Sequence, residues 1–275
     1  MCVALCCIVW MFEEDHPMYA TERQRQIEEF IAADGRVSVV ALAERYEVTT
    51  ETIRRDLAAL EAAGLVRRVH GGAVAPSRVS TTEPSFVERS GVRSPAKQSI
   101  ARAALRLLGG SFSGSVYLDA GTTVSALAQE VALLPSATAL DVVTHSMTAA
   151  HVLAGTSVDL TAIGGRVRGL TAAAVGAQTV AAISQLRPDI AFIGANGLSG
   201  EFGLSTPDPD EAAVKRQIVA AARRVVVLAD AQKFDAELLV SFAPLSAVDV
   251  LVTDEAPRGS LADALEAADV EVQVA

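Results

Sequence analysis

Residues 49–57 decide the character of the N-terminal part of this chain: Thr49-Thr50-Glu51-Thr52-Ile53-Arg54-Arg55-Asp56-Leu57. The hydroxyl of Thr49 can accept a hydrogen bond from the free amides of a first helical turn, so a helix is predicted to begin after it. Its apolar residues recur at helical spacing and form the buried stripe: Ile53, Leu57 and Leu60. Arg54 and Arg55 are therefore predicted to lie on the exposed side, near the N-terminal end of the helix.

A second basic stretch follows this helix. Apolar and basic residues alternate through Leu65-Val66-Arg67-Arg68-Val69, and the chain turns at Gly71-Gly72 before it returns through Ala73-Val74. Alternation on both sides of a glycine pair predicts a β-hairpin. Residues 21–33 and 39–46 have the pattern of two preceding helices. Together these segments predict a winged helix-turn-helix domain.

This arrangement favours binding to duplex DNA. A recognition helix places its N-terminal side chains in the major groove, where arginine can bridge two acceptors on guanine and threonine can touch a thymine methyl or a phosphate. The alternative is a solvated helix face on which Arg54 and Arg55 pair with Glu51 and Asp56. We favour DNA because the hairpin adds arginines beside the same surface, suited to phosphates or the minor groove. The predicted DNA-contacting residues are Thr50, Thr52, Arg54, Arg55, Arg67, Arg68 and His70.

The chain as a whole is acidic, with a formal net charge of −10 over 275 residues. This charge does not exclude DNA binding, because a locally basic face is what matters. The length suggests about two domains. No apolar run reaches the roughly 18 residues of a membrane-spanning helix, so we expect no membrane partner. The absence of cysteine from residue 18 onward suits a reducing cytoplasm, the location we predict.

Residues 1–17 differ from the rest of the chain. They hold all three cysteines and Trp10 in a short apolar run that ends before Glu13-Glu14-Asp15. A signal peptide needs a positive start and a small-residue cleavage site, and the cysteine spacing fits neither a paired zinc site nor a disulfide framework. We expect Met18 to be the physiological start and residues 1–17 to be a non-native or disordered extension, in preference to a membrane anchor or a redox segment.

Residues 96–275 alternate apolar strands with helices. The predicted strands lie near residues 116–118, 140–143, 158–163, 190–193, 225–228, 248–252 and 270–274, and the helices near 97–108, 123–134, 147–153, 175–185, 210–222 and 261–267. This alternation predicts an α/β domain with a mostly parallel sheet covered on both faces. Residues 77–95, rich in Ser, Thr, Arg and Glu, are interpreted as a linker with a short helix near 86–89, after a DNA-binding domain at 18–76.

Polar, glycine-rich loops follow four of these strands. Asp119-Ala120-Gly121-Thr122-Thr123 opens a helix, and its amides and hydroxyls can hold a phosphate at the positive helix end. The other three loops are Thr144-His145-Ser146, Gly164-Gly165-Arg166-Val167-Arg168 and Gly194-Ala195-Asn196-Gly197. Ligands of α/β sheets bind at the carboxyl ends of the strands. With no cofactor fingerprint present, the set favours a small phosphorylated polyol or sugar.

Each of these residues also has a simpler interpretation. The glycines can serve tight turns, Thr122 or Ser146 can cap a helix, and Glu211 and Lys215, one turn apart, can form a surface ion pair. Taken as a set, the residues indicate an effector site. The predicted effector-binding residues are Asp119, Gly121, Thr122, Thr123, Thr144, His145, Ser146, Gly165, Arg166, Asn196, Glu211, Lys215 and Lys233. We predict no cofactor, no metal site and no catalytic residue.

Several stretches of the N-terminal part match a known family: Glu22-Arg23-Gln24, Gly35-Arg36-Val37, Ala41-Leu42-Ala43, Thr52-Ile53-Arg54-Arg55-Asp56-Leu57 and Arg68-Val69-His70-Gly71-Gly72-Ala73. Through them, residues 19–74 resemble the DeoR family of bacterial transcriptional regulators. Many members have Val-Ser where this chain has Val48-Thr49, a change that keeps the hydroxyl cap.

The remainder, from Lys97 onward, is similar to the DeoR-type effector domain, which shares its fold with ribose-5-phosphate isomerase. The matching stretches are Lys97-Gln98-Ser99-Ile100-Ala101, the Asp119–Thr123 loop, Thr144-His145-Ser146, Gly164-Gly165 and Asp230-Ala231-Gln232-Lys233-Phe234. Many members have Asn in place of His145. The nearest likeness is to actinobacterial regulators of fructose phosphotransferase operons, through Ala195-Asn196-Gly197, Gly203-Leu204-Ser205-Thr206-Pro207-Asp208 and Glu211-Ala212-Ala213-Val214-Lys215-Arg216. This likeness implies fructose 1-phosphate as one effector.

The leading hypothesis is a repressor of a sugar catabolism operon, a homo-oligomer (dimer or tetramer) that binds a double-stranded DNA operator and is released by a phosphorylated sugar. The alternative is a sugar-phosphate isomerase-like enzyme that carries a DNA-binding domain. Isomerisation needs a positioned base and acid, which Glu211, Lys215, Asp230 and Lys233 can in principle supply. No base–acid pair stands out at a fixed spacing, and the DNA-binding half would be unexplained. We therefore expect a regulator and not an enzyme.

Overall fold

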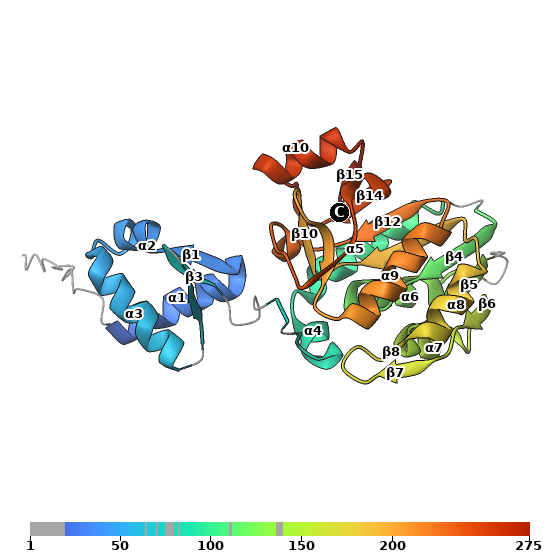
Figure 1. Ribbon diagram of the computed structural model, residues 1–275, viewed down its shortest axis with the longest axis horizontal. Helices are drawn as coiled ribbons and strands as arrows, with labels where there is room; N and C mark the ends of the chain where they lie inside the picture. The colour runs from blue at the N-terminus through green and yellow to red at the C-terminus, as the bar shows by residue number, and fades with distance from the viewer. Residues whose placement is uncertain are drawn as a thin grey trace, which may run out of the picture. The chain divides into compact units, whose positions relative to one another are not determined.

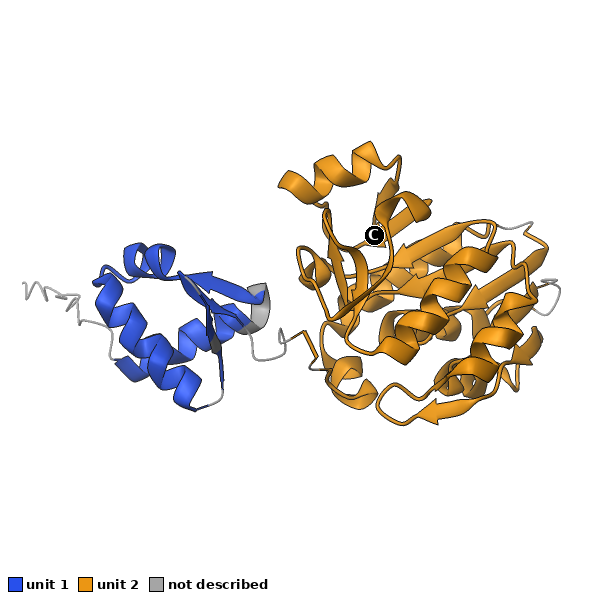
Figure 2. Ribbon diagram, viewed as in Figure 1, with its two compact units in different colours: residues 1–76 blue, residues 77–275 orange. Residues whose placement is uncertain are grey.

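The computed structural model of the chain describes residues 20–63, 65–69, 71–74, 80–81, 83–109, 112–135 and 140–275. They divide into two compact units, Met1–Pro76 and Ser77–Ala275 (Figure 2). The expectations for residues 1–17 and for His70 concern positions outside the described residues. Within the described part of the chain, no helix combines the length and the apolar character that crossing a membrane requires.

The first unit has three helices and a small antiparallel sheet among its described residues (Figure 1). The elements in chain order are α1 (Ala20–Asp34), β1 (Arg36–Ser38), α2 (Val39–Arg45), α3 (Thr50–Ala62), β2 (Arg67–Val69) and β3 (Gly72–Val74). The side chains predicted as the buried stripe of α3, with others from α1 and α2, form its core: Ile27, Ile31, Leu42, Ile53, Leu57 and Leu60. The predicted winged helix-turn-helix fold is confirmed.

The hairpin β2–β3 is extended by β1, which gives the strand order β1-β3-β2. Gly72 permits this close pairing, because a Cβ atom at this position would lie 2.0 Å from the carbonyl oxygen of Val37. The amide of Val39 donates to the carbonyl of Gly71 at 2.8 Å. The wing is therefore held against the start of α2 as well as against α3.

The second unit is built on a parallel sheet, seven-stranded over the described residues, with the order β15-β14-β12-β9-β4-β5-β6. Its strands are β4 (Gly114–Leu118), β5 (Leu140–Thr144), β6 (Asp159–Ala162), β9 (Ile190–Gly194), β12 (Val225–Leu228), β14 (Val250–Thr253) and β15 (Glu271–Val274). The helices are α4 (Phe86–Gly91), α5 (Ser94–Arg106), α6 (Thr122–Ala132), α7 (Met147–Leu153), α8 (Ala177–Ser184), α9 (Pro209–Ala221) and α10 (Gly259–Ala267). The predicted parallel α/β architecture is confirmed.

Successive side chains of each strand enter two separate cores, as the period of a strand requires. Val116 and Leu118 pack with α5, α6 and α7 on one face, whereas Tyr117 between them packs on the other face with α8, α9 and α10. Because both faces are covered, the central strands β9, β12 and β14 are almost continuously apolar.

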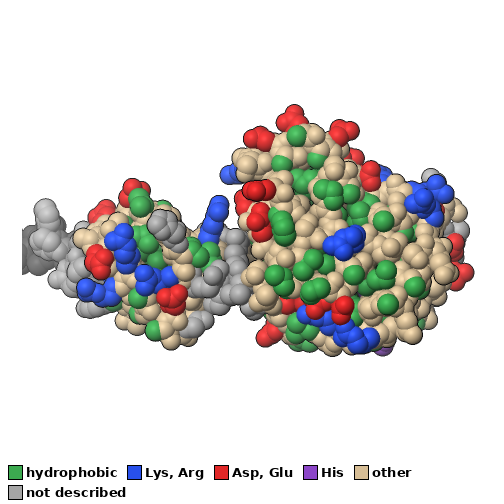
Figure 3. All heavy atoms as spheres, viewed as in Figure 1, with side chains coloured by type: hydrophobic (Ala, Val, Ile, Leu, Met, Phe, Trp, Pro, Cys, Tyr) green, Lys and Arg blue, Asp and Glu red, His purple; other side chains and the backbone are tan. Residues whose placement is uncertain are grey.

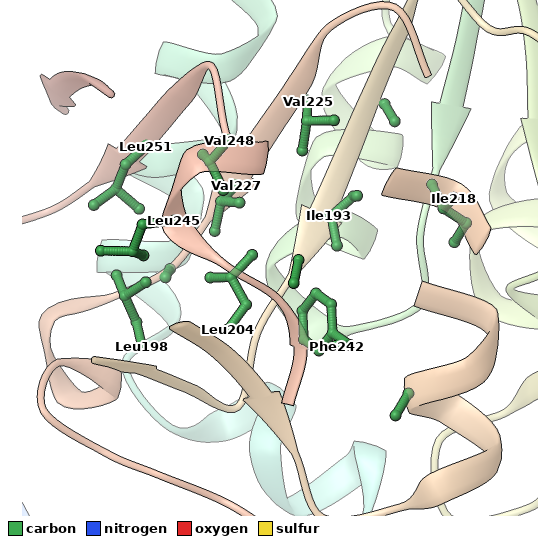
Figure 4. Packing of buried hydrophobic residues seen from close by; sticks show 14 of the residues in the cluster. Ile193, Leu198, Leu204, Ile218, Val225, Val227, Phe242, Leu245, Val248 and Leu251 are labelled. Carbon is green, nitrogen blue, oxygen red and sulfur yellow. The ribbon is translucent and has the colours of Figure 1, made fainter. Parts of the chain in front are cut away.

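A second, antiparallel sheet covers part of the face that carries Tyr117. It consists of β10 (Gly197–Ser199), β11 (Gly203–Thr206) and β13 (Val240–Ala243), which the periodicity of the sequence did not predict. Figure 4 shows Leu204 and Phe242 packing toward Ile193 of β9, with Val227 of β12 in the same cluster. A hairpin formed by β7 (Arg166–Arg168) and β8 (Ala173–Val175) follows β6 and was not predicted either.

The described part of the predicted linker, residues 77–95, makes specific bonds within the second unit. The amide of Phe86, the first residue of α4, donates to the carbonyl of Leu170 in the β7–β8 hairpin at 2.9 Å. The carbonyl of Ser80 accepts from the amide of Leu239 at 3.0 Å. Figure 1 shows α4 beside the β7–β8 hairpin. This segment is therefore packed on the α/β unit and is not a free spacer over its described residues.

Candidate functional site

The predicted recognition helix α3 begins where its cap requires. The Thr49 hydroxyl accepts from the amide of Thr52 at 3.2 Å and lies 2.9 Å from the Thr52 hydroxyl. Thr50, Arg54 and Arg55 are exposed, and Thr52 is half-buried. Figure 3 shows Lys and Arg side chains gathered on the visible face of this unit, where Figure 1 places α3. Side chains at the start of α3 are thus presented to the outside, as groove reading requires.

Among the described residues, Arg54 and Arg55 of α3 form no strong ion pair with an acidic side chain. Arg54 lies 3.5 Å from Glu51, and both side chains are more than half exposed, so this pair contributes little to stability. Asp56 is instead buried, and accepts from Arg23 Nε at 2.6 Å and from Gln24 Nε2 at 2.9 Å. The hypothesis that Asp56 neutralises the arginines of its own helix is therefore wrong: Asp56 fixes α3 against α1.

The wing is tied to the end of α3. The amide of Arg68 donates to Glu61 Oε1 at 2.8 Å, and the Arg68 side chain is exposed. The side chain of Arg67 and the whole of His70 lie outside the described residues. Arg68 is thus available for contact with a DNA backbone on the same unit as Arg54 and Arg55.

In the second unit, the structure brings Asp119, His145 and Lys215 together at the carboxyl ends of β4, β5 and β9. Lys215 Nζ, from α9, donates to Asp119 Oδ2 and to the carbonyl of Gly194, the latter at 2.8 Å. The amide of Gly194 donates to the same Asp119 oxygen at 2.9 Å. The side chains of all three residues are buried.

His145 lies between a phenol and a carboxylate. Its Nδ1 is 2.9 Å from the Tyr117 hydroxyl, and its Nε2 is 3.6 Å from Asp119 Oδ1. Burial is the main cause that lowers the pKa of His145 to about 4, so the ring is neutral at pH 7. Burial and the charge of Asp119 raise the pKa of Tyr117, so its hydroxyl stays protonated. The tautomer consistent with these groups has Tyr117 donating to Nδ1 and the Nε2 proton facing Asp119.

Asp119 Oδ1 is a buried acceptor that has no hydrogen-bond partner among the described residues. Buried carboxylate oxygens normally have a partner, so each exception calls for an explanation. The adjoining helix α6 begins at Thr122, its N-cap residue Gly121 has a φ of +140°, and no side chain caps its first turn. Free amides at a helix start attract anions. The Asp119–Thr123 loop therefore combines an unpaired acceptor with free donors.

The loop after β5 has a structural role in addition. The Thr144 hydroxyl donates to the carbonyl of Leu118 at 2.7 Å and accepts from the amide of Ser146 at 3.0 Å. Ser146 caps α7 by accepting from the amide of Ala149 at 3.2 Å, which confirms its interpretation as a helix cap. Thr148 joins the hydroxyls of Ser146 and Ser125, at 2.9 and 3.1 Å.

The loop after β6 presents a different arginine to the site from the one predicted. Gly165 is required by packing, since a Cβ atom would lie 2.1 Å from the Thr179 hydroxyl. Arg166 points to solvent and pairs with exposed Asp210. Arg168 is the half-buried cation: it donates to Asp208 at 3.0 Å and to Glu211 at 3.1 Å.

Glu211 and Lys215 do not form the surface ion pair that their spacing permits. Both side chains are buried, and Glu211 accepts from the Thr171 hydroxyl and from Arg168, whereas Lys215 binds Asp119. Burial, and next the charge of Glu83, raise the pKa of Glu211. Asn196 donates to Glu83 at 3.3 Å. Glu83 lies in the predicted linker, and no local sequence pattern marked it.

Basic groups also collect near the end of β12. Lys97 is buried and donates to the carbonyl of Arg89, and burial is the main cause that lowers its pKa to about 8. Lys233 follows β12 in a short 3₁₀ turn that Asp230 caps. Among the described residues, no grouping of His, Cys, Asp and Glu suits a metal ion.

Known protein families match both halves of the chain. The DeoR C-terminal sensor domain matches residues 93–255, and the DeoR-like helix-turn-helix domain matches residues 23–79. The chain belongs to the DeoR family. GlpR of Haloferax volcanii, an HTH-type transcriptional regulator, is 35% identical over 93% of this chain and 98% of its own length. The glycerol-3-phosphate regulon repressor of Escherichia coli is 32% identical, over 90% and 96%. FruR of Bacillus subtilis, named as an HTH-type transcriptional regulator, is 33% identical, over 86% and 92%.

For this DeoR-family chain, the helix-turn-helix match covers α3 and the wing, and the sensor match covers the strand-end residues from Asp119 to Lys233. The relatives are named as transcriptional regulators, the role that the helix-turn-helix match also indicates for this chain. Ribose 5-phosphate isomerase A of Methanocaldococcus jannaschii shares 17% identity over 50% of this chain and 53% of that chain, with a TM-score of 0.37, too low to bear on function.

Proposed function

We propose that this DeoR-family protein is a sequence-specific repressor of a sugar-utilisation operon, released from its operator when a phosphorylated sugar binds the α/β unit. Two or more subunits bind paired half-sites on duplex DNA. The observation that carries the sensing part is Asp119 Oδ1, a buried carboxylate oxygen without a hydrogen-bond partner among the described residues, next to the free amides of α6.

The DNA-binding part rests on α3 and the wing. Arg54 and Arg55 are exposed on α3, and among the described residues their one acidic contact is the weak pair between Arg54 and Glu51. Arginine suits the paired acceptors of guanine in the major groove. We assign Thr50, Thr52, Arg54 and Arg55 to the groove, and Arg67, Arg68 and His70 to the DNA backbone.

The effector part follows from the donors and acceptors at the strand ends. The first amides of α6 and the hydroxyls of Thr122 and Thr123 are suited to a phosphate, because the helix dipole favours an anion there. Asp119 Oδ1 is then free to accept from a sugar hydroxyl. His145 is neutral at pH 7 and donates from Nε2 toward the same space.

Fructose 1-phosphate is our first candidate for the effector. The sequence likeness to regulators of fructose phosphotransferase operons supports this choice. The name of the glycerol-3-phosphate regulon repressor of Escherichia coli points to a small phosphorylated polyol as a second candidate. Both candidates carry a phosphate monoester and vicinal hydroxyls, the chemistry that the loop and Asp119 can bind.

Gel-shift titration against the DNA upstream of the chain's own reading frame tests this proposal. We expect a retarded complex that fructose 1-phosphate, or another sugar phosphate of a panel, dissolves, while the unphosphorylated sugar does not. Retardation that no sugar phosphate changes would refute the effector claim and leave DNA binding standing. Measurable turnover of ribose 5-phosphate would refute the assignment as a regulator without enzymatic activity.

A further inference from the structure

Glu83 is buried at the strand-end site although it comes shortly after the DNA-binding unit in the sequence. Its side chain is 1% exposed. Oε2 accepts from Arg168 Nη1 at 2.7 Å, while Oε1 accepts from Asn196 Nδ2 at 3.3 Å and lies 3.3 Å from Arg89 Nη1. One carboxylate thus takes up donors from two guanidinium groups and an amide.

Two of these donors are linked to the proposed effector site. Arg168 also contacts Glu211, and Asn196 follows Gly194, whose amide binds Asp119. A guanidinium group of arginine binds phosphate oxygens and carboxylate oxygens through the same paired hydrogen bonds. Arg89 has capacity to spare, because its Nε and Nη2 are buried without hydrogen-bond partners among the described residues.

Several hydrogen bonds hold the segment that carries Glu83 in place. We call this segment the strap (residues 83–91). A capping box between Ser85 and Glu88 starts its helix, α4. Its ends are held by the bond from the Phe86 amide to Leu170 and by Lys97, which donates to the carbonyl of Arg89. The strap is continuous in sequence with the segment that leads back to Pro76.

We propose that Glu83 is a tethered competitor of the effector: its carboxylate occupies a second anion subsite, formed by Arg168, Arg89 and Asn196, which the effector phosphate takes over as the alternative to the first amides of α6. Release of Glu83 then frees the strap from Arg168 and Asn196. This inference rests on the proposed function.

The competition between Glu83 and the ligand obeys a simple equilibrium. A ligand that binds only when Glu83 has left binds with an affinity reduced by the fraction of molecules in that state. The substitution Glu83→Gln removes the competing charge and leaves the donors of Arg168, Arg89 and Asn196 in place. The affinity of the subsite for an anion should therefore rise, whereas a purely structural ion pair would give no such gain.

Calorimetric titration of the full chain with inorganic phosphate tests the competition. We expect Glu83→Gln to bind phosphate about tenfold more tightly than the wild type. Glu201→Gln, which removes a charge at an exposed turn, should match the wild type. Adding Arg89→Gln to Glu83→Gln should abolish the gain. Phosphate affinity of Glu83→Gln that is unchanged, weaker or undetectable would overturn the proposal.

A second measurement uses the unaltered protein, in case the variant folds poorly. Hydrogen exchange at the amides of Phe86 and Leu239, which bond to Leu170 and Ser80, should accelerate in saturating phosphate, while the amide of Ala149 should not change. Unchanged or slower exchange at Phe86 would overturn the proposal. Neither experiment includes DNA, so failure of operator binding and failure of the Glu83 competition are seen separately.

Discussion

Lys215 and Asp119 form an ion pair across 96 residues of sequence, with side chains that are 6% and 0% exposed. Lys215 lies on α9, and Asp119 follows β4, so the pair joins a helix to the end of the central sheet. Both groups also bind the backbone of Gly194. The charges at the centre of the proposed effector site are therefore compensated before any ligand arrives.

The first prediction concerns the energetics of this pair. Lys215→Met should lower the free energy of unfolding by about 3–5 kcal/mol, because it leaves the buried Asp119 charge uncompensated. Asp119→Asn combined with Lys215→Met should be less destabilised than the sum of the single variants. Urea unfolding measures these changes. As a matched control, Arg166→Met breaks an exposed pair with Asp210 and should change stability by less than about 1 kcal/mol. Equal losses for Lys215→Met and Arg166→Met would refute this view of the pair.

The second prediction concerns DNA reading. Arg54→Ala should weaken operator binding by about 1–3 kcal/mol and relax its specificity, because a bidentate contact with guanine is lost. Arg25→Ala is the matched control: Arg25 is an exposed arginine on α1, engaged with Glu22 and Glu29. Fluorescence anisotropy with labelled operator measures both variants. Equal effects of the two changes would show that general charge, and not base reading, accounts for the role of Arg54.

The sequence predicts the parts of this fold that depend on neighbouring residues. It predicts poorly the parts that depend on contacts between residues far apart in the chain. The stripe of Ile53, Leu57 and Leu60 is local and periodic, and it correctly predicted the buried side of α3. Asp56 shares that side at helical spacing, but its charge suggested solvent, and only its partner Arg23, 33 residues earlier, explains its burial. The strands β7, β8 and β10 are only three residues long, too short to show a period.

The same difference between local and long-range contacts applies to the candidate site. Loops that follow strands were recognisable from composition, so Asp119, His145 and Asn196 were selected as candidates, a role that stays a prediction. Glu83 was not, because its partners Arg168 and Asn196 are 85 and 113 residues away and nothing near it in sequence marks a binding role. Arg166 and Arg168 are alternate residues of β7 and share one side of the strand, so only their distant partners distinguish them. Exposed Arg166 pairs with Asp210, whereas half-buried Arg168 pairs with Glu83 and Glu211.

The third prediction separates sensing from DNA binding. Thr122→Ala should leave operator affinity unchanged and weaken release by the sugar phosphate, because it removes a hydroxyl at the first turn of α6. Thr161→Ala, at an exposed position of the edge strand β6, should behave like the wild type. The measurement is the sugar-phosphate concentration that dissolves half of the complex. Loss of operator binding by a folded Thr122→Ala protein would contradict this division of labour.

The fourth prediction concerns pH. His145 has a pKa of about 4 in the folded protein, below its ordinary value of 6.5, so the folded state disfavours the proton. Between these values the unfolded state binds more protons, and stability must fall as the pH falls from about 6.5 to about 4. The loss from this group is roughly 3 kcal/mol at most. His145→Asn should flatten the pH profile of the unfolding free energy over this range. An identical slope in the variant would show that other groups cause the acid sensitivity.

The central claim is that one chain couples a phosphorylated sugar to operator release, and the dissociation constant of the operator with and without fructose 1-phosphate tests it most directly. We expect saturating sugar phosphate to raise that constant roughly 5- to 150-fold, the usual range of coupling between two sites, and the operator to weaken sugar-phosphate binding by the same factor. An operator affinity that is identical in the presence and absence of every sugar phosphate tried would contradict the account.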